Sequence, residues 1–226
     1  MPAAQEREKK RLFLAINFGV ATTRKIADAV ARMRTVADRR GLRVGWVPPA
    51  NLHLTLKFLG WSSAEVVEAI RDRTVAAAAG VPPFELAARG AGGFPSDGHA
   101  RILWVGVVDP GGVLSSLVGR LEVEMAALGF ARESHAFHPH VTVGRVKDGR
   151  GTDEVLAPFK DVPFGSSQIR ELVLYESFTK SSGSEYIAQF RVPLSRPERQ
   201  TRMVDGEQES EDPDGGKDVG KDGSPG

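Results

Sequence analysis

Residues 51–60 read NLHLTLKFLG, and this segment decides the fold that the sequence predicts. Apolar residues alternate in it with His53, Thr55 and Lys57, which is the period-two pattern of a strand with one face against a core. His53 and Thr55 are therefore predicted to share the other face, so that an imidazole and a hydroxyl lie side by side.

A second segment, residues 137–145 with the sequence FHPHVTVGR, repeats the His-x-Thr pattern. Val141 and Val143 alternate with His140 and Thr142, so the same argument places that imidazole beside that hydroxyl. The chain holds five histidines, and two of them occupy equivalent positions in two predicted strands. The two segments are far apart in the chain. Each is expected in its own half of the molecule, facing the other across a cleft.

The paired segments favour proton-transfer chemistry on an anionic ligand. Histidine has the ordinary pKa nearest physiological pH, so one imidazole can give a proton while the other takes one. Each threonine hydroxyl is a short donor suited to a phosphate oxygen. Two imidazoles without a nearby carboxylate or thiolate make a poor zinc site. We therefore expect no metal and no other cofactor.

Composition narrows the class of protein further. A chain of 226 residues with 41% hydrophobic content can form one large domain or two closely packed halves. It contains no cysteine, which excludes disulfides and thiolate metal sites and agrees with a reducing compartment. The first residues are polar, and no apolar segment after them is long enough for a signal or a membrane span. We expect a cytoplasmic monomer with no membrane partner.

Charge is distributed unevenly along the chain. The formal net charge is +1, but residues 198–226 carry nine acidic and four basic residues, which leaves a basic body of net charge +6. A basic body fits a polyanionic ligand. The acidic segment has almost no large apolar residues and cannot offset its ordering entropy. We predict a flexible N-terminus over residues 1–10, a two-lobed domain over residues 11–197 and a disordered tail over residues 198–226.

The order of predicted elements occurs twice. Strand, helix, His-x-Thr strand and helix appear before residue 80, and the same order appears again over residues 101–159. Two further strands, residues 169–178 and 186–192, are predicted to form a hairpin. This order predicts an α+β, bilobal, pseudo-twofold fold. Its two antiparallel-rich sheets would carry helices on their outer faces, with an active-site cleft between the lobes.

Local signals place several boundaries. Thr22 or Thr23 is predicted to cap the first helix. Ser62 followed by Glu65 fits a capping box that opens the second helix. The glycines of residues 90–93 predict a turn or flexible loop.

At the paired segments the sequence resembles the two-histidine phosphoesterase superfamily, and within it the RNA 2′,3′-cyclic phosphodiesterases, also called 2′-5′ RNA ligases. The resemblance covers about residues 11–194. It includes RLFLAI at residues 11–16, GFP at 93–95, RILWVGV at 101–107 and LYES at 174–177. It implies a bilobal fold, no metal, and hydrolysis of a ribose 2′,3′-cyclic phosphate to a 2′-phosphomonoester.

The resemblance also implies a role for each site residue. His140 is expected to accept the proton of the attacking water, and His53 to donate a proton to the leaving 3′-oxygen. Thr55 and Thr142 would hold non-bridging phosphate oxygens, and Arg145 would balance charge on the phosphoryl group. Strict alternation puts Arg145 on the face opposite His140. It reaches the cleft only if the strand twists or bulges.

Other functions stay open at this point. The expected partner is RNA with a 2′,3′-cyclic phosphate end or a small cyclic nucleotide, and ligation is the reverse reaction. One alternative is a phosphodiesterase for a small nucleotide such as an ADP-ribose cyclic phosphate. The other is a non-catalytic module that binds RNA ends.

The bulky side chains near the paired segments have simpler interpretations. Phe58, Trp46 and Trp104 could stack a base, but their apolar neighbours favour core packing. Lys57 is open between surface charge and phosphate steering. His138 is expected at the surface or, because it shares parity with the second site histidine, lining the cleft.

Overall fold

The computed structural model describes residues 9–96, 99–147, 151–180 and 183–195. The predicted acidic tail, nearly all of the predicted flexible N-terminus and the turn residues 181–182 lie outside the described residues. Among the residues that are described, no helix is both long and apolar enough to cross a membrane.

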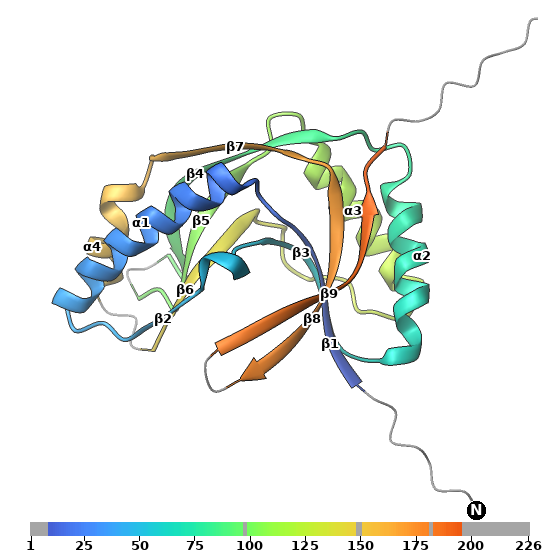
Figure 1. Cartoon of the computed structure of the whole chain (residues 1–226), viewed down its shortest axis with the longest axis horizontal. Helices are drawn as coiled ribbons and strands as arrows, with labels where there is room; N and C mark the ends of the chain where they lie inside the picture. Colours follow the sequence, from blue (N-terminus) through green and yellow to red (C-terminus); the bar gives the residue numbers. More distant parts are fainter. Residues whose placement is uncertain (1–8, 97–98, 148–150, 181–182, 196–226) are drawn as a thin grey trace, which may run out of the picture.

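Strands dominate the fold, and Figure 1 shows how they are arranged. The strands are β1 (Lys9–Ile16), β2 (Val44–Trp46), β3 (Leu54–Ser63), β4 (Phe84–Phe94), β5 (Ile102–Val108), β6 (His140–Val146), β7 (Pro163–Ile169), β8 (Glu171–Lys180) and β9 (Gly183–Pro193). The helices are α1 (Val20–Arg39), α2 (Val67–Ala78), α3 (Val113–Ala126) and α4 (Thr152–Leu156), with 3₁₀ turns η1 (Pro49–Asn51), η2 (Ala64–Val66) and η3 (Ala157–Phe159).

The strands form one antiparallel sheet in the order β7-β4-β5-β6-β3-β1-β8-β9, with β2 alongside β6. We call β3, β1, β8 and β9 the first half, and β6, β5, β4, β7 and β2 the second half. The halves meet between β3 and β6, where Leu54 pairs with Val141. The α+β fold with two antiparallel-rich lobes is confirmed. The two expected sheets are the two halves of this one continuous sheet.

The helices exchange halves. Helix α1 follows β1 of the first half, but it packs against α4, β7 and β2 of the second half. Helix α3 follows β5 of the second half, but it packs against α2 and β3 on the first half. Figure 1 shows α1 with α4 on one side of the molecule and α2 with α3 on the other. The outer-face position of the helices is confirmed, while each repeat of the sequence contributes to both halves.

The predicted helix caps are wrong in detail. Gly19 is the residue before α1, and no side chain caps that end. The hydroxyl of Thr22 donates to the carbonyl oxygen of Ser166 at 2.8 Å, which ties α1 to β7. Ser62 is buried, and its neighbour Ser63 accepts the backbone N–H of Glu65 at 3.2 Å. The buried hydroxyl of Thr22 thus binds the neighbouring sheet instead of capping the helix.

The predicted turn at residues 90–93 is also wrong, because these glycines belong to β4. Gly92 pairs with Trp104 of β5, and a Cβ added to Gly92 would lie 2.4 Å from the Trp104 ring. The missing side chain lets the indole lie across the neighbouring strand. Glycine here provides close packing in a strand and not a change of direction.

Candidate active site

The two His-x-Thr segments meet at the junction of the two halves. His53 directly precedes β3, and His140 is the first residue of β6. The strands are antiparallel and pair at the residues that follow each histidine, so the four polar side chains lie on one face of the sheet around this pair. The valine and leucine side chains of that pair are buried, while the two histidines and two threonines, His53, Thr55, His140 and Thr142, are half-buried. The structure therefore brings these four predicted residues together.

Both imidazoles are held in the same way. Nδ1 of His53 lies 2.7 Å from the carbonyl oxygen of Asn51, and Nδ1 of His140 lies 2.7 Å from that of His138. A carbonyl can only accept, so each Nδ1 carries the hydrogen and each neutral ring leaves Nε2 as an acceptor. Nε2 of His53 lies 3.1 Å from the hydroxyl of Thr55. Each ring can therefore take or give a proton at Nε2.

Both histidine pKa values lie below the ordinary value of 6.5. For His53 burial is the main cause, His140 lowers the pKa further by charge repulsion, and the hydrogen bond to Asn51 opposes both. Burial is also the main cause of the lowered pKa of His140. The hydrogen bond to the His138 carbonyl raises this pKa, while the nearby charges of His138 and Arg145 lower it further. Both rings are therefore mainly neutral at pH 7.

A β-bulge in β6 brings Arg145 to the site face. Trp104 pairs with Thr142, but the preceding residue of β5 pairs with Gly144, which leaves Val143 as an extra residue. The extra residue reverses the alternation that follows it, so the exposed Arg145 lies on the same face as Thr142. The sequence allowed Arg145 to reach the cleft only if the strand twists or bulges, and β6 contains such a bulge.

An equivalent bulge follows the threonine of β3. Ala15 pairs with Thr55, but the preceding residue of β1 pairs with Lys57, which leaves Leu56 as an extra residue. Lys57 is consequently turned into the core, while Phe58 is 64% exposed. The prediction of core packing for Phe58 is wrong. Phe58 stands five residues after the first histidine, as the arginine does after the second.

Lys57 is a structural residue. Its side chain is 4% exposed, and Nζ donates to both carboxylate oxygens of Glu122 at 2.9 Å and to the carbonyl oxygen of Ala131 at 2.9 Å. These contacts join β3 to α3 and to the segment that leads toward β6. Of the two interpretations left open by the sequence, neither surface charge nor phosphate steering describes this lysine.

Aromatic side chains surround His53. Its ring centroid lies 4.9 Å from Phe13, 5.2 Å from Tyr186 and 6.3 Å from Tyr175. A cavity of about 320 Å³ opens beside these rings, and its polar lining includes Asn17, Asn51 and Arg191. The sequence did not identify these residues as part of the site. Tyr175 stands in the late strand of the resemblance, and this was the only signal that pointed to it.

A second aromatic wall lies beside His140. Phe94 is 5.2 Å and Trp104 is 6.5 Å from the His140 ring, and the His138 ring lies 5.3 Å from Trp104. Trp104 is only half-buried, so its predicted place in the core is wrong, and it lines the site. His138 is exposed and lies at the cleft, which was one of its two expected positions.

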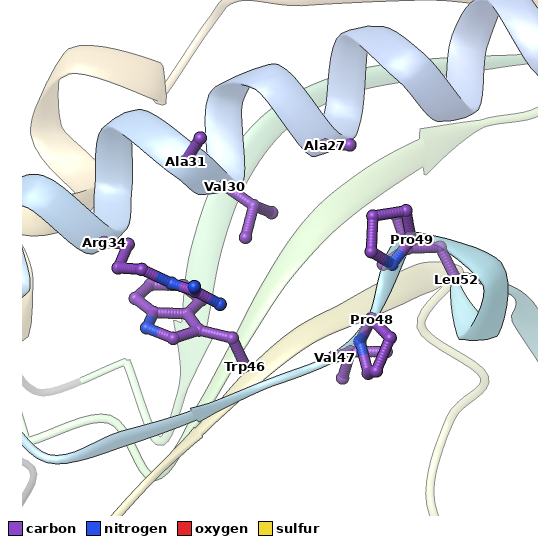
Figure 2. A pocket seen from close by; sticks show the side chains of 9 residues that line it. All are labelled: Ala27, Val30, Ala31, Arg34, Trp46, Val47, Pro48, Pro49 and Leu52. Atoms are coloured by element: carbon purple, nitrogen blue, oxygen red, sulfur yellow. The ribbon is translucent and has the colours of Figure 1, made fainter. Parts of the chain in front are cut away.

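Trp46, by contrast, packs against the core as predicted. It also borders a separate apolar groove of about 440 Å³ between α1 and η1, whose lining includes Val30, Arg34, Pro48 and Pro49. Figure 2 shows Arg34 and Trp46 among the side chains that line this groove. The groove contains neither histidine of the paired segments. Among the described residues, no group of three or more histidine, aspartate or glutamate side chains could hold a metal ion.

The fold and the paired segments place the chain in a class of phosphoesterases. The sequence profile of the 2′-5′ RNA ligase superfamily matches residues 23–178, and the chain belongs to this superfamily. It is 34% identical over 181 residues to a protein of Methanothermobacter thermautotrophicus named RNA 2′,3′-cyclic phosphodiesterase, covering 79% of this chain and 95% of that protein. A protein of Aquifex aeolicus with the same name is 30% identical, covering 74% of this chain and 90% of its own length.

Solved structures of related proteins also resemble this chain in fold. A crystal structure of a protein from Thermus thermophilus superposes with a TM-score of 0.69 at 26% identity, covering 83% of this chain and 99% of that one. LigT of Escherichia coli in complex with 3′-AMP superposes with a TM-score of 0.64 at 27% identity, covering 84% of this chain and all of the other. The resemblance drawn from the paired segments is confirmed.

Proposed function

We propose that this chain is an RNA 2′,3′-cyclic phosphodiesterase that hydrolyses cyclic phosphate ends to 2′-phosphomonoesters. The observation that carries the proposal is the pair of imidazoles, His53 and His140, which reach one junction from two halves with Nδ1 tied to the backbone and Nε2 available. The names of the relatives and the superfamily support the same reaction.

The reaction needs a base and an acid on opposite sides of phosphorus. Water attacks phosphorus in line with the departing 3′-oxygen, so a P–O bond to water forms as the bond to the 3′-oxygen breaks. Neutral His140 takes the water proton at Nε2, and protonated His53 gives the proton at its Nε2 to the 3′-oxygen. The two rings exchange protonation states in each turnover. A 5′-hydroxyl that attacks the cyclic phosphate in place of water displaces the same 3′-oxygen and forms a 2′-5′ bond.

The remaining predicted residues stabilise the phosphoryl oxygens. The Thr55 hydroxyl, 3.1 Å from Nε2 of His53 without substrate, can turn to donate to a non-bridging oxygen. Thr142 occupies the equivalent position in the other half. Arg145 lies on the same face, and its side chain makes no hydrogen bond or ion pair with the described residues, so its guanidinium can meet the negative charge. We also expect a cytoplasmic monomer that needs no metal.

Two alternatives make different predictions. A phosphodiesterase for small nucleotides would prefer mononucleotides, and the 3′-AMP complex of LigT shows that a protein of this fold binds a ligand of that size. A non-catalytic module would bind cyclic ends without forming product. The intact histidines and threonines in both segments favour catalysis over binding alone.

The test is to incubate the chain, with chelator present, with 2′,3′-cyclic mononucleotides and oligonucleotides and to compare products with authentic 2′- and 3′-phosphates. We expect 2′-phosphates. A 3′-phosphate product would reverse the leaving-group assignment, and binding without product would support the non-catalytic module. Loss of activity with chelator, restored by a divalent ion, would contradict the metal-free mechanism.

A further inference from the structure

Two large aromatic side chains of β3 lie open to solvent beside the site. Phe58 is 64% exposed and Trp61 is 69% exposed. Exposed aromatic residues close together on one strand mark an interaction surface, because leaving them in water gains no burial free energy. Neither side chain takes part in the proton transfers proposed above.

Strand register places both side chains on one face of the first half. Phe58 pairs with Phe13, and Trp61 pairs with Arg11 of the same strand β1. Alternate residues of β1 share a face, so these four side chains do too. A second bulge, at Leu59 beside Gly60, makes this possible. Gly60 has φ +71°, a value that other residues rarely adopt.

This face continues directly from the proposed proton donor. Phe13 lies 4.9 Å from the ring of His53 and 6.0 Å from the ring of Phe58. Aromatic rings thus lead away from His53 along β3 toward Trp61. We call Phe58 and Trp61, with the neighbouring Arg11 of β1, the β3 aromatic row.

Cationic side chains accompany the row. Arg11 pairs with Trp61. Lys9 lies two residues earlier on β1, so its side chain is on the same face of the sheet as that of Arg11. Both are exposed, and neither forms an ion pair with the residues that the structure describes. Exposed aromatic groups on β3 beside exposed cationic groups on the neighbouring β1 match single-stranded nucleic acid, whose bases stack and whose phosphates attract cations.

We propose that the β3 aromatic row binds the single-stranded RNA on the 5′ side of the cyclic phosphate end. The bases stack on Phe58 and Trp61, and the phosphates approach Arg11 and Lys9. This inference rests on the proposed function and deepens it, because it makes an RNA chain, and not a small nucleotide, the preferred substrate. Stacking is tolerant of base identity, so the preference depends on length and not on sequence.

The readout is the ratio of kcat/KM for a cyclic-ended tetranucleotide to kcat/KM for a cyclic mononucleotide. We expect this ratio to be well above one in the unchanged chain, and to fall about tenfold in Phe58→Ala and in Trp61→Ala, since one stacked base is lost in each. Arg11→Gln should weaken the salt dependence of the tetranucleotide reaction. Phe58→Leu, which keeps bulk without the aromatic face, separates stacking from packing.

Phe178→Ala is the matched control. Phe178 of β8 is 37% exposed and stands three residues after Tyr175, so it faces the opposite side of the same half. The Phe178→Ala variant should have the same ratio of kcat/KM values as the unchanged chain. Equal ratios in Trp61→Ala and Phe178→Ala would overturn the inference and leave the row to another partner, such as a protein.

Binding separates failure of this inference from failure of the proposed function. An oligonucleotide that already ends in a 2′-phosphate cannot be hydrolysed, and its affinity is measured by fluorescence anisotropy. If no cyclic substrate is cleaved, the proposed function fails. Weaker binding in Trp61→Ala than in Phe178→Ala would still support an RNA-binding row, and equal binding would reject it.

Discussion

Leu54 of β3 pairs with Val141 of β6, and this pair joins the two halves of the sheet. Each member follows a histidine and precedes a threonine. One backbone pairing therefore fixes the relative position of two imidazoles that are far apart in the chain. Each half contributes one imidazole, an arrangement that suits the proposed reaction, which needs an acid and a base on opposite sides of one phosphorus atom.

Removing either imidazole should severely reduce turnover. We expect His53→Ala and His140→Ala each to lower kcat by about 10²–10⁴, because each removes one proton-transfer step. The double variant should lose little more than the worse single variant, since the two groups act as one unit. Single-turnover kinetics measure these losses. His135→Ala, an exposed residue outside the site, is the control, and near-normal rates in either site variant would refute the mechanism.

The pH dependence should be displaced toward acid. The active form has one protonated and one neutral imidazole, and both histidine pKa values lie below 6.5 because of burial. As pH rises through these pKa values the acid loses its proton, and as pH falls below them the base becomes protonated. We expect kcat/KM to form a bell with its maximum below pH 6.5. A maximum above about pH 7 would contradict this assignment.

Arg145→Gln should change both rate and pH profile. The guanidinium disfavours protonation of His140, so its removal raises the pKa of His140. The acidic limb of kcat/KM should move to higher pH, while kcat falls because the phosphoryl charge loses a partner. Arg170→Gln, an exposed arginine outside the site face, is a suitable control. An unchanged acidic limb would place Arg145 too far from the ring to act on it.

Alternation along the strands was enough to predict that His53 and Thr55 share a face, and that His140 and Thr142 do too. It could not predict the residues beyond each threonine, because a bulge depends on how the neighbouring strand is registered. One extra residue, Leu56 in β3 and Val143 in β6, reverses the facing of the side chains that follow it, until a further bulge such as that at Leu59 restores it. The assignment of Phe58 to the core failed for this reason.

Helix placement was beyond the sequence for a different reason. The apolar spacing of α1 predicts a buried face, but both halves of the sheet offer an apolar surface to cover. Nothing local in residues 20–39 distinguishes the two surfaces. The choice is made by contacts such as Thr22 with Ser166 of β7, which lie far apart in the chain.

The buried ion pair should matter for stability. Glu122→Ala leaves the ammonium of Lys57 buried without its carboxylate, and we expect a loss of about 3–5 kcal/mol in the free energy of unfolding. The paired change Lys57→Met with Glu122→Leu should recover much of this loss. Urea unfolding measures both. A loss below about 1 kcal/mol for Glu122→Ala would show that the pair is solvated.

Gly92→Ala should disturb the wall beside the second histidine. Its Cβ would lie 2.4 Å from the Trp104 ring, so the indole must shift and its packing against the His138 ring must change. We expect lower stability, an altered near-ultraviolet circular dichroism spectrum and reduced kcat. Gly119→Ala in α3, where nothing lies within 4 Å of the added Cβ, should instead raise stability by about 1 kcal/mol.

The exchange of helices between halves makes the molecule indivisible. A fragment ending before β4 would retain α1 without β7 and α4, against which it packs, and the complementary fragment would present that surface bare. Neither piece could hold a stable shape in isolation, so denaturation should proceed as a single cooperative event. Native fluctuations that melt one lobe alone are thereby suppressed, and the spacing of the two imidazoles persists for as long as the protein is folded.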